Sequence, residues 1–188
     1  GIVNPPTAWL GPGLETIGFG QGITTTALQL LTAASALAND GMLVPPHMVR
    51  MVRDREGRVV RAVSPQPARR VVTPETARAL LRMMVRTVED GTGKMAAVPG
   101  YTVAGKTGTA QKPAPDGGYL VGRYIASFLG FVPVPDPRLA ILVVLDEPRG
   151  AYFGGAVAAP VFREIASRTL WYLRVPPMTP LALPPQTP

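Results

Sequence analysis

The chain has no cysteine and a single histidine, His47, among its 188 residues. These absences exclude a disulfide-stabilised scaffold, a zinc site built on thiolates, a thiol nucleophile and a histidine-rich metal site. Long apolar runs are missing as well. The cleanest run, residues 139–145, has seven residues, whereas a helix that crosses a membrane needs about 20. The length instead suits one compact domain with its own hydrophobic core.

The two ends of the chain have distinctive compositions. The first residues have neither the basic start nor the apolar stretch of a secretory signal, and the chain does not begin with Met. We therefore expect an excerpt of a longer polypeptide or a cleavage product. At the other end, residues 175–188 contain six prolines. They predict a disordered tail behind a folded body of residues 1–174.

Positive charge exceeds negative charge, with 19 Lys and Arg against 12 Asp and Glu and a net charge of +7. Arg78, Arg82 and Arg86 follow one another at a spacing of four, which predicts one exposed face of a helix. Basic and aromatic residues are not interleaved as they are in RNA-binding proteins. We therefore expect no nucleic-acid partner. An anionic surface of lipid headgroups or cell-wall polymer stays open on charge alone.

Three helices are predicted from the spacing of apolar residues. The first spans 24–39, and its apolar side chains cover most of the circumference, so we expect it to be largely buried. The second follows Thr73, a good N-cap residue with proline behind it, and ends at Gly91. The third spans 158–173. Its inner face is expected to carry Phe162, Ile165, Ala166, Leu170 and Leu173.

Strands are predicted where β-prone residues lie between turn residues. Segments 49–54 and 58–63 flank a Glu-Gly turn and predict a hairpin. Segments 101–107, 123–132 and 138–146 predict an antiparallel meander, with the last helix packed on one face. This order of elements favours an α+β fold over a doubly wound sheet.

Residues 100–107 match the phosphate-binding pattern G-x-x-x-x-G-K-[ST]. A nucleotide site would need a loop that wraps the phosphates, followed at once by a helix. Here the residues inside the pattern favour a strand, and the residues after Thr107 are too rich in Gly and Pro for a helix. A P-loop nucleotide-binding protein therefore stays only as an alternative hypothesis.

The same residues suit a different chemistry. Lys106, Thr107 and Gly108, followed by Thr109, resemble the K-T-G triad of penicillin-binding proteins and class A β-lactamases. Without a side chain, Gly108 lets a substrate lie along the strand and pair with its backbone. The cation of Lys106 and the hydroxyl groups of Thr107 and Thr109 suit a carboxylate ligand.

Further segments occur in the order found in class B penicillin-binding proteins. Together, residues 15–173 resemble the C-terminal half of the transpeptidase domain of that family. The segment Tyr152–Phe162 is most similar to the division-specific (septal) branch and its sporulation relatives. The segments that carry the resemblance are Gly18–Gly22, Leu28–Leu30, Ala36–Asn39, Tyr101–Gln111, Tyr124–Pro133, Asp136–Arg138, Val143–Pro148 and Tyr152–Phe162.

This resemblance implies a penicillin-binding transpeptidase (serine β-lactamase-like) fold, of which the chain would hold three core strands of the antiparallel sheet and the flanking helices. It implies a D,D-transpeptidase that cross-links peptidoglycan stem peptides through a serine acyl-enzyme and is a target of β-lactams. Lys106 would assist proton transfer, and no cofactor or metal is implied. The residues expected to bind substrate are Thr107, Gly108 and Thr109, with Gln21, Tyr152 and Phe153 as candidates for the walls of the groove.

The resemblance also implies partners and a location. The substrate would be the D-Ala-D-Ala end of stem peptides, with β-lactams as competing ligands. The upstream half of the same domain and cell-division membrane proteins, including a glycosyltransferase, would be protein partners. The parent protein would act on the extracytoplasmic face of the bacterial membrane, anchored by an N-terminal transmembrane helix outside these residues.

The chain departs from the family pattern at its serines. The family needs a Ser-x-x-Lys nucleophile and a Ser-x-Asn motif, but none of the four serines has Lys at the third position after it or Asn at the second. We expect both motifs upstream of Gly1 and predict that the isolated chain is inactive. The alternative is a binding or interaction module without activity.

Two other candidates are expected to be structural. His47 follows two prolines in a loop and has no partner motif. Asp146 and Glu147 are adjacent in a predicted strand, so their side chains should point to opposite faces. A shared acid–base site is therefore not expected there.

Overall fold

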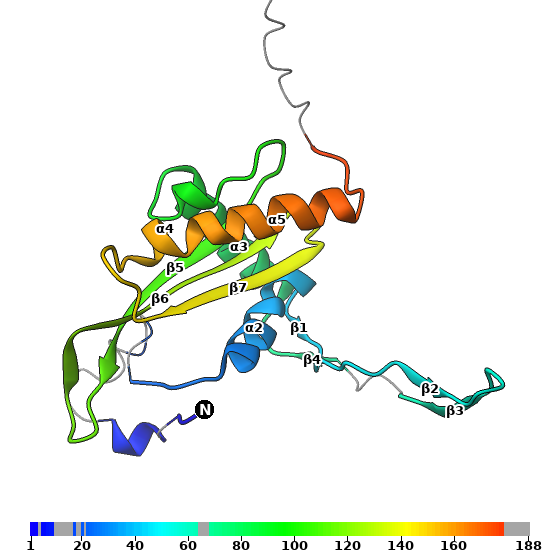
Figure 1. The fold of residues 1–188 in the computed structure, drawn as a ribbon, viewed down its shortest axis with the longest axis horizontal. Coiled ribbons are helices and arrows are strands. Elements are labelled where there is room, and N and C mark those ends of the chain that lie inside the picture. Colours follow the sequence, from blue (N-terminus) through cyan, green and yellow to red (C-terminus); the bar gives the residue numbers. More distant parts are fainter. Residues whose placement is uncertain (4, 10–16, 18–19, 21, 64–67, 179–188) are drawn as a thin grey trace, which may run out of the picture.

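A three-stranded antiparallel sheet forms the centre of the molecule (Figure 1). The structure, a computed structural model, describes residues 1–178 except 4, 10–16, 18–19, 21 and 64–67. The strands β5 (Ala104–Pro113), β6 (Tyr119–Val132) and β7 (Leu139–Asp146) lie in the order β5-β6-β7. The predicted α+β meander is therefore confirmed.

The first strand of the meander begins later and ends later than the predicted 101–107. Tyr101 forms only an isolated bridge with Val98, while β5 continues to Pro113. The reason is the length of β6, which starts at Tyr119 and gives partners to the whole stretch from Ala104 to Gln111. The connecting turn contains Gly117 and Gly118, both at positive φ, a conformation that favours glycine.

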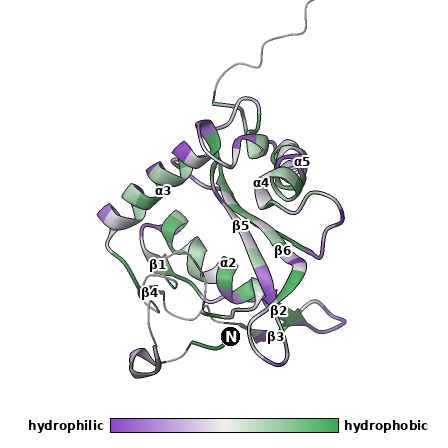
Figure 2. Ribbon diagram, turned by 90° about the vertical axis from the view of Figure 1, so that its left-hand side faces the viewer, coloured by the Kyte–Doolittle hydropathy of each residue, from purple (hydrophilic) through white to green (hydrophobic). Residues whose placement is uncertain are grey.

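Helices cover both faces of this sheet, and each face has its own apolar core (Figure 2). On one face, α4 (Gly154–Val157) leads into α5 (Ala159–Tyr172), and Phe162 packs against Phe128 of β6 with ring centroids 4.8 Å apart. On the other face, α3 (Pro74–Glu89) and α2 (Ala27–Ser35) pack against Leu129 and Phe131. Phe128 and Leu129 are adjacent, so the alternation of strand side chains separates the two cores.

The helix predicted after Thr73 is confirmed. The Thr73 hydroxyl accepts the backbone N–H of Thr76 at 3.2 Å, and Pro74 occupies the first turn. The arginine spacing lies on an exposed face, where Arg78 pairs with Asp40 and Arg86 pairs with Glu89 and Asp90. The residues that α3 buries are Ala77, Leu81 and Val88.

The expectation that the first helix is largely buried is wrong. α2 is shorter than predicted, begins after a capping box of Thr26 and Gln29, and passes into the short 3-10 helix η2 (Leu37–Asn39). Leu28 is 59% exposed and Leu30 41% exposed. Only the side of α2 with Leu31 and Ala34 packs on the sheet. Apolar residues on every side of a helix therefore do not imply that every side is buried.

The last helix has a narrower inner face than predicted. Phe162, Ala166 and Leu170 are fully buried, whereas Ile165 and Leu173 are 42% and 46% exposed. The cause is that α5 rests on the sheet with one side only (Figure 1). Ile165 lies outside that side, and Leu173 follows the last residue of the helix.

The start of the segment predicted as a tail bonds to the body. The Tyr101 hydroxyl donates to the carbonyl oxygen of Val175 at 2.6 Å, and the N–H of Met178 donates to Gly100 at 2.8 Å. Residues 179–188 lie outside the described residues.

The predicted hairpin is confirmed as β2 (Met51–Arg53) and β3 (Val59–Ala62), which extend away from the central sheet (Figure 1). At its tip the Asp54 carboxylate accepts the N–H groups of Glu56 and Arg58 and pairs with the Arg58 side chain, which lowers the pKa of Asp54. A small sheet of β1 (Met42–Leu43) and β4 (Arg69–Arg70) lies at its base and was not predicted.

Two further short helices complete the described elements, η1 (Pro6–Ala8) and η3 (Lys94–Ala96). Among the residues described, no helix combines the length and the apolar character that crossing a bilayer requires.

Candidate functional site

The residues predicted to carry the chemistry lie on the edge strand of the central sheet. β5 pairs with β6, and no other strand of the described residues lies along its outer side. The Lys106 side chain points to the face of α2 and α3, because Ala104, two residues before it, belongs to the core on that face. Gly108 occupies a position of the same face. Thr107 and Thr109 point to the face of α4 and α5. The Lys106 cation and the two threonine hydroxyls therefore lie on opposite faces of β5, beside its unpaired backbone edge.

The hydroxyl of Thr107 is held by a second threonine. Its Oγ1 lies 2.8 Å from Oγ1 of Thr92, in the connection between α3 and η3. Gly155 covers this contact, since a Cβ built there would lie less than 3 Å from the Thr92 carbonyl oxygen and 3.4 Å from the Thr107 methyl group. The Thr92 connection, the start of α4 and the β5 edge are thus in direct contact.

The hydroxyl of Thr109 is held by the backbone at the start of α4. The N–H of Gly154 donates to Thr109 Oγ1 at 3.0 Å. A Cβ at Gly154 would lie less than 3 Å from the carbonyl oxygens of Ser127 and Gly108. Only a glycine lets the helix start approach the strand closely enough for this hydrogen bond.

Lys106 is exposed at the same edge. Its Nζ donates to the carbonyl oxygen of its neighbour Thr107 at 2.9 Å, and no acidic side chain in the described part of the chain forms an ion pair with it. Its charge is therefore available to an anionic ligand.

Aromatic side chains gather where β5 passes Thr109. Tyr124 lies opposite Gln111 in the β5–β6 register, and the Tyr152 ring stacks on it with centroids 4.2 Å apart and planes 12° from parallel. The Phe153 ring lies 4.5 Å from that of Tyr152 and is 59% exposed. Phe153 directly precedes Gly154, so the two predicted aromatic residues come next to Thr109. Gln21 lies outside the described residues.

An ion cluster fixes the far end of β5. Lys112 Nζ lies 3.0 Å from Asp146 and 2.9 Å from Glu147, and Arg123 also pairs with Glu147. The hydrogen bond from Lys112, followed by that from Arg123, lowers the pKa of Glu147, and the bonds to Glu147 and Asp146 raise the pKa of Lys112. The prediction of opposite faces for the two carboxylates is wrong, because Glu147 follows the end of β7 with φ of 51°.

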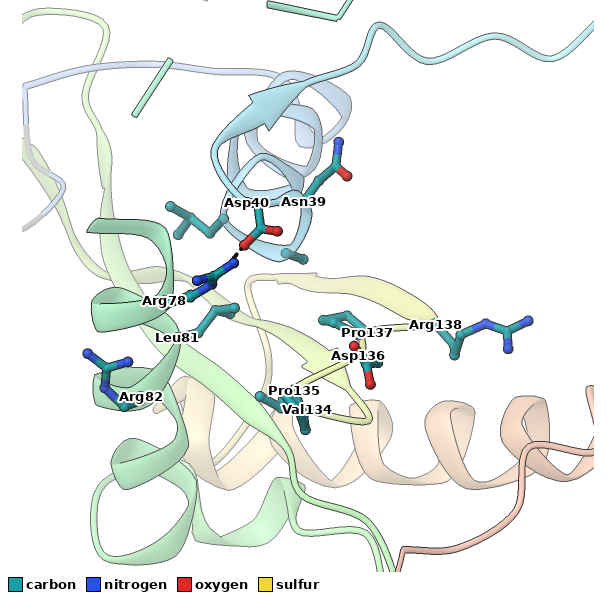
Figure 3. Close-up of a pocket in the computed structure, with 12 residues that line it drawn as sticks. Asn39, Asp40, Arg78, Leu81, Arg82, Val134, Pro135, Asp136, Pro137 and Arg138 are labelled. Atoms are coloured by element: carbon teal, nitrogen blue, oxygen red, sulfur yellow. Dashed lines mark hydrogen bonds and ion pairs between the residues drawn. The ribbon is translucent and has the colours of Figure 1, made fainter. Parts of the chain in front are cut away.

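A pocket of about 560 Å³ lies between η2, α3 and the β6–β7 turn. Figure 3 shows Arg78 pointing at Asp40 across it, with an Nε–Oδ1 distance of 3.0 Å. Its lining contains none of the residues 106–109. The pocket is therefore separate from the candidate site.

The structure excludes the phosphate-binding interpretation of residues 100–107. Lys106 and Thr107 lie inside β5 rather than at the start of a helix, and the strand continues for six residues beyond Thr107. The amide cradle that phosphates need is therefore not formed there. The described residues also contain no group of three His, Asp or Glu side chains that could hold a metal ion.

The family follows from a comparison with known proteins. A family model described as "Penicillin binding protein transpeptidase domain" matches residues 1–167. The chain belongs to this family. The fold expected from the resemblance, a partial α+β transpeptidase domain, is thereby confirmed.

Relatives of this chain come from several bacteria. PbpB of Mycolicibacterium smegmatis is 40% identical over 198 residues, which cover 100% of this chain and 30% of that protein. A probable peptidoglycan D,D-transpeptidase, PenA of Neisseria flavescens, is 36% identical over 184 residues, covering 97% of this chain and 43% of that protein.

A solved relative has the same fold. Penicillin-binding protein 3 of Mycobacterium tuberculosis superposes with a TM-score of 0.84 at 34% identity, over 96% of this chain and 43% of that one. It has also been solved with aztreonam bound. The chain thus spans less than half the length of these relatives.

Sequence reasoning did not single out as site residues several residues around the β5 edge, namely Thr92, Tyr124, Gly154 and Gly155. Gly154 and Gly155 are adjacent in the sequence, and such a pair indicates that another backbone segment approaches closely. No local pattern marked Thr92, which lies 15 residues before its partner Thr107.

Proposed function

We propose that this chain supplies the carboxylate-binding side of a peptidoglycan D,D-transpeptidase, which cross-links stem peptides through a serine acyl-enzyme. The observation that carries the proposal is the open edge of β5, with the Thr107 and Thr109 hydroxyls on one face and the Lys106 cation on the other. The terminal carboxylate of a D-Ala-D-Ala peptide or of a β-lactam accepts hydrogen bonds from the two hydroxyls. A relative named as a D,D-transpeptidase supports the same chemistry.

Each residue has a role in acyl transfer. Gly108 lets the substrate backbone approach β5, and Lys106 assists proton transfer together with the serine of a Ser-x-Asn motif. The backbone N–H of Thr109 contributes to the oxyanion hole. Tyr152 and Phe153 wall the groove, and Gln21 remains a predicted contact. No step of this scheme uses a cofactor.

The nucleophile comes from polypeptide outside these 188 residues. None of the four serines has a lysine three residues later to activate it. α2 offers that polypeptide exposed apolar side chains. Burial of one leucine against it would contribute about 1.5–3 kcal/mol. Leu28 and Leu30 lie on opposite flanks of α2, and we expect each of them to contact the upstream half of the domain.

Covalent labelling with a fluorescent penicillin tests this function. The 188-residue chain alone should give no labelled band, whereas the natural protein that contains it should be labelled. In the natural protein Lys106→Ala should reduce labelling, and Lys94→Ala, which removes an exposed lysine of η3, should not. A labelled band of 19.9 kDa from the chain alone, lost on substitution of one serine, would overturn the proposed division of the active site. An unlabelled natural protein would favour a binding module without activity.

The setting of the reaction belongs to the same proposal. The protein acts on the extracytoplasmic face of the bacterial membrane, held by a transmembrane helix outside these residues, and works in cell division beside a lipid-linked glycosyltransferase. A fluorescent fusion of the natural protein should collect at the division site. Even distribution around the envelope would argue for a role in elongation instead.

A further inference from the structure

Two hydroxyl groups meet at one side of the candidate carboxylate site. Oγ1 of Thr92 lies 2.8 Å from Oγ1 of Thr107, and by geometry either oxygen could be the donor. Each hydroxyl has one hydrogen and two lone pairs, so one hydrogen lies between the two oxygens and the other is free. Which threonine donates decides what Thr107 presents to a ligand.

The two directions have opposite consequences for an anion. If Thr107 donates to Thr92, Thr107 turns lone pairs toward the groove and repels a carboxylate. If Thr92 donates to Thr107, the hydrogen of Thr107 is free to donate to the carboxylate, and the bond from Thr92 strengthens it as a donor.

Thr109 provides a built-in comparison. Its Oγ1 accepts from the backbone N–H of Gly154 at 3.0 Å, and an amide nitrogen in that position only donates. The hydrogen of Thr109 is therefore free in every case. Thr107 matches Thr109 only when Thr92 is the donor.

Packing keeps the two hydroxyl oxygens together. Gly93, which follows Thr92, is buried, and a Cβ built on it would lie 3.1 Å from the Phe128 ring. On the other side, Gly155 packs closely against both threonines. A Cβ built on it would lie less than 3 Å from the Thr92 carbonyl oxygen and 3.4 Å from the Thr107 methyl group. The backbone at Thr92 is thus held beside Thr107 by contacts that involve neither hydroxyl.

We propose that Thr92 is a positioning residue for carboxylate recognition: its hydroxyl donates to Thr107, so that Thr107 and Thr109 both turn hydrogens toward the ligand. This inference rests on the proposed function and adds the residue that sets the hydrogen-bond direction at that site. It predicts that the contribution of the Thr92 hydroxyl to the acylation rate depends on the negative charge of the ligand.

The test measures the second-order rate constant of acylation of the natural protein by a penicillin and by the methyl ester of the same penicillin. Thr92→Val, which keeps the shape but removes the hydroxyl, should slow acylation by the free acid about 3- to 10-fold, the loss typical of one hydrogen bond. The rate with the ester should not change. Thr92→Ser, which restores the hydroxyl, should return the rate with the acid to near that of the wild type.

Two further variants make the result specific. In a Thr107→Val background, Thr92→Val should have no additional effect, because its partner hydroxyl is absent. Thr87→Val is the matched control, since the Thr87 hydroxyl donates to the carbonyl oxygen of Met83 within α3 and lies outside the site. Its acylation rates should equal those of the wild type, and melting temperatures check that every variant folds.

Several outcomes would overturn the inference. Faster acylation of Thr92→Val by the free acid would mean that Thr107 is the donor, and an unchanged rate would mean that Thr92 has no positioning role. Equal slowing with acid and ester would indicate a general structural effect. If the wild-type protein is not acylated at all, the proposed function itself fails, which separates the two failures.

Discussion

At the scale of single residues, the choice of threonine on β5 has a physical reason. A threonine side chain is branched at Cβ, which restricts its χ1 angle and suits a strand. Thr107 and Thr109 therefore hold their hydroxyls in defined positions at little additional entropic cost, while Thr92 and the Gly154 amide fix the direction of each hydroxyl. A serine would keep the chemistry but lose part of this restriction.

Removal of the Thr109 hydroxyl should separate carboxylate binding from oxyanion stabilisation. Thr109→Ala in the natural protein keeps the backbone N–H but loses one hydrogen bond to a charged group. We expect acylation by a β-lactam to slow about 10- to 150-fold, equivalent to about 1.5–3 kcal/mol. The melting temperature should fall only slightly, because the Gly154 N–H also loses its acceptor. Thr109→Pro should be far worse, because it deletes the N–H itself. A wild-type rate for Thr109→Ala beside a slow Thr107→Ala would contradict the assignment of both threonines.

At the scale of elements, the ends of all three strands meet in one ion cluster. Lys112 near the end of β5 and Arg123 in β6 both pair with Glu147, just beyond β7. Exposed ion pairs contribute little singly, but a network that joins three strands resists fraying of the sheet at this end. The aromatic stack of Tyr124 on Tyr152 lies beside it, so the cluster also supports the residues that we propose as the groove wall.

The ion cluster should make stability depend on pH in a defined direction. The pKa of Glu147 is lower in the folded protein than its ordinary value, because Lys112 and Arg123 bond to the carboxylate. Its contribution is therefore complete above the unfolded-state pKa of about 4.3 and is lost as the pH falls through the lower folded-state value. The melting temperature of the wild type should exceed that of Glu147→Gln at pH 7, and the gap should close on acidification.

The matched control for this measurement is Glu164→Gln, which removes an ion pair with Arg168 on the surface of α5. Its melting temperature at pH 7 should lie closer to that of the wild type, since this pair joins no two elements. A gap between wild type and Glu147→Gln that stays constant from pH 7 to about pH 3 would contradict the proposed coupling.

At the scale of the whole molecule, the fold depends on two cores divided by one thin sheet. Phe128 and Phe162 join β6 to α5 on one face, and both are fully buried. Phe162→Ala should lower the free energy of unfolding by about 3–5 kcal/mol. Ile165→Ala, three residues later on a half-exposed flank, should cost about 1 kcal/mol or less. Chemical denaturation measures both, and equal losses would show that α5 does not pack as described.

Local signals made part of this fold predictable. The Thr73 cap with its proline and the turn between β2 and β3 act within a few residues, and both predictions are confirmed. The extent of β5 and the exposure of α2 depend on distant partners, and the sequence predicted both wrongly. For the site, the K-T-G pattern marked residues 106–108, whereas the bond between Thr109 and Gly154 joins residues 45 positions apart. Only the tertiary structure brings such residues together.

The open edge of β5 has a consequence for how the protein behaves at high concentration. An edge strand with unpaired backbone groups is a template for a strand of another molecule, and Lys and Pro are residues that oppose such pairing. β5 carries Lys106 and Lys112 and ends at Pro113, but Lys112 is neutralised by its ion pairs, which leaves Lys106 as the main charge against edge-to-edge association. A ligand that lies along this edge occupies the same backbone groups. If the proposed substrate site lies along this edge, saturation with a β-lactam should therefore suppress self-association of the protein.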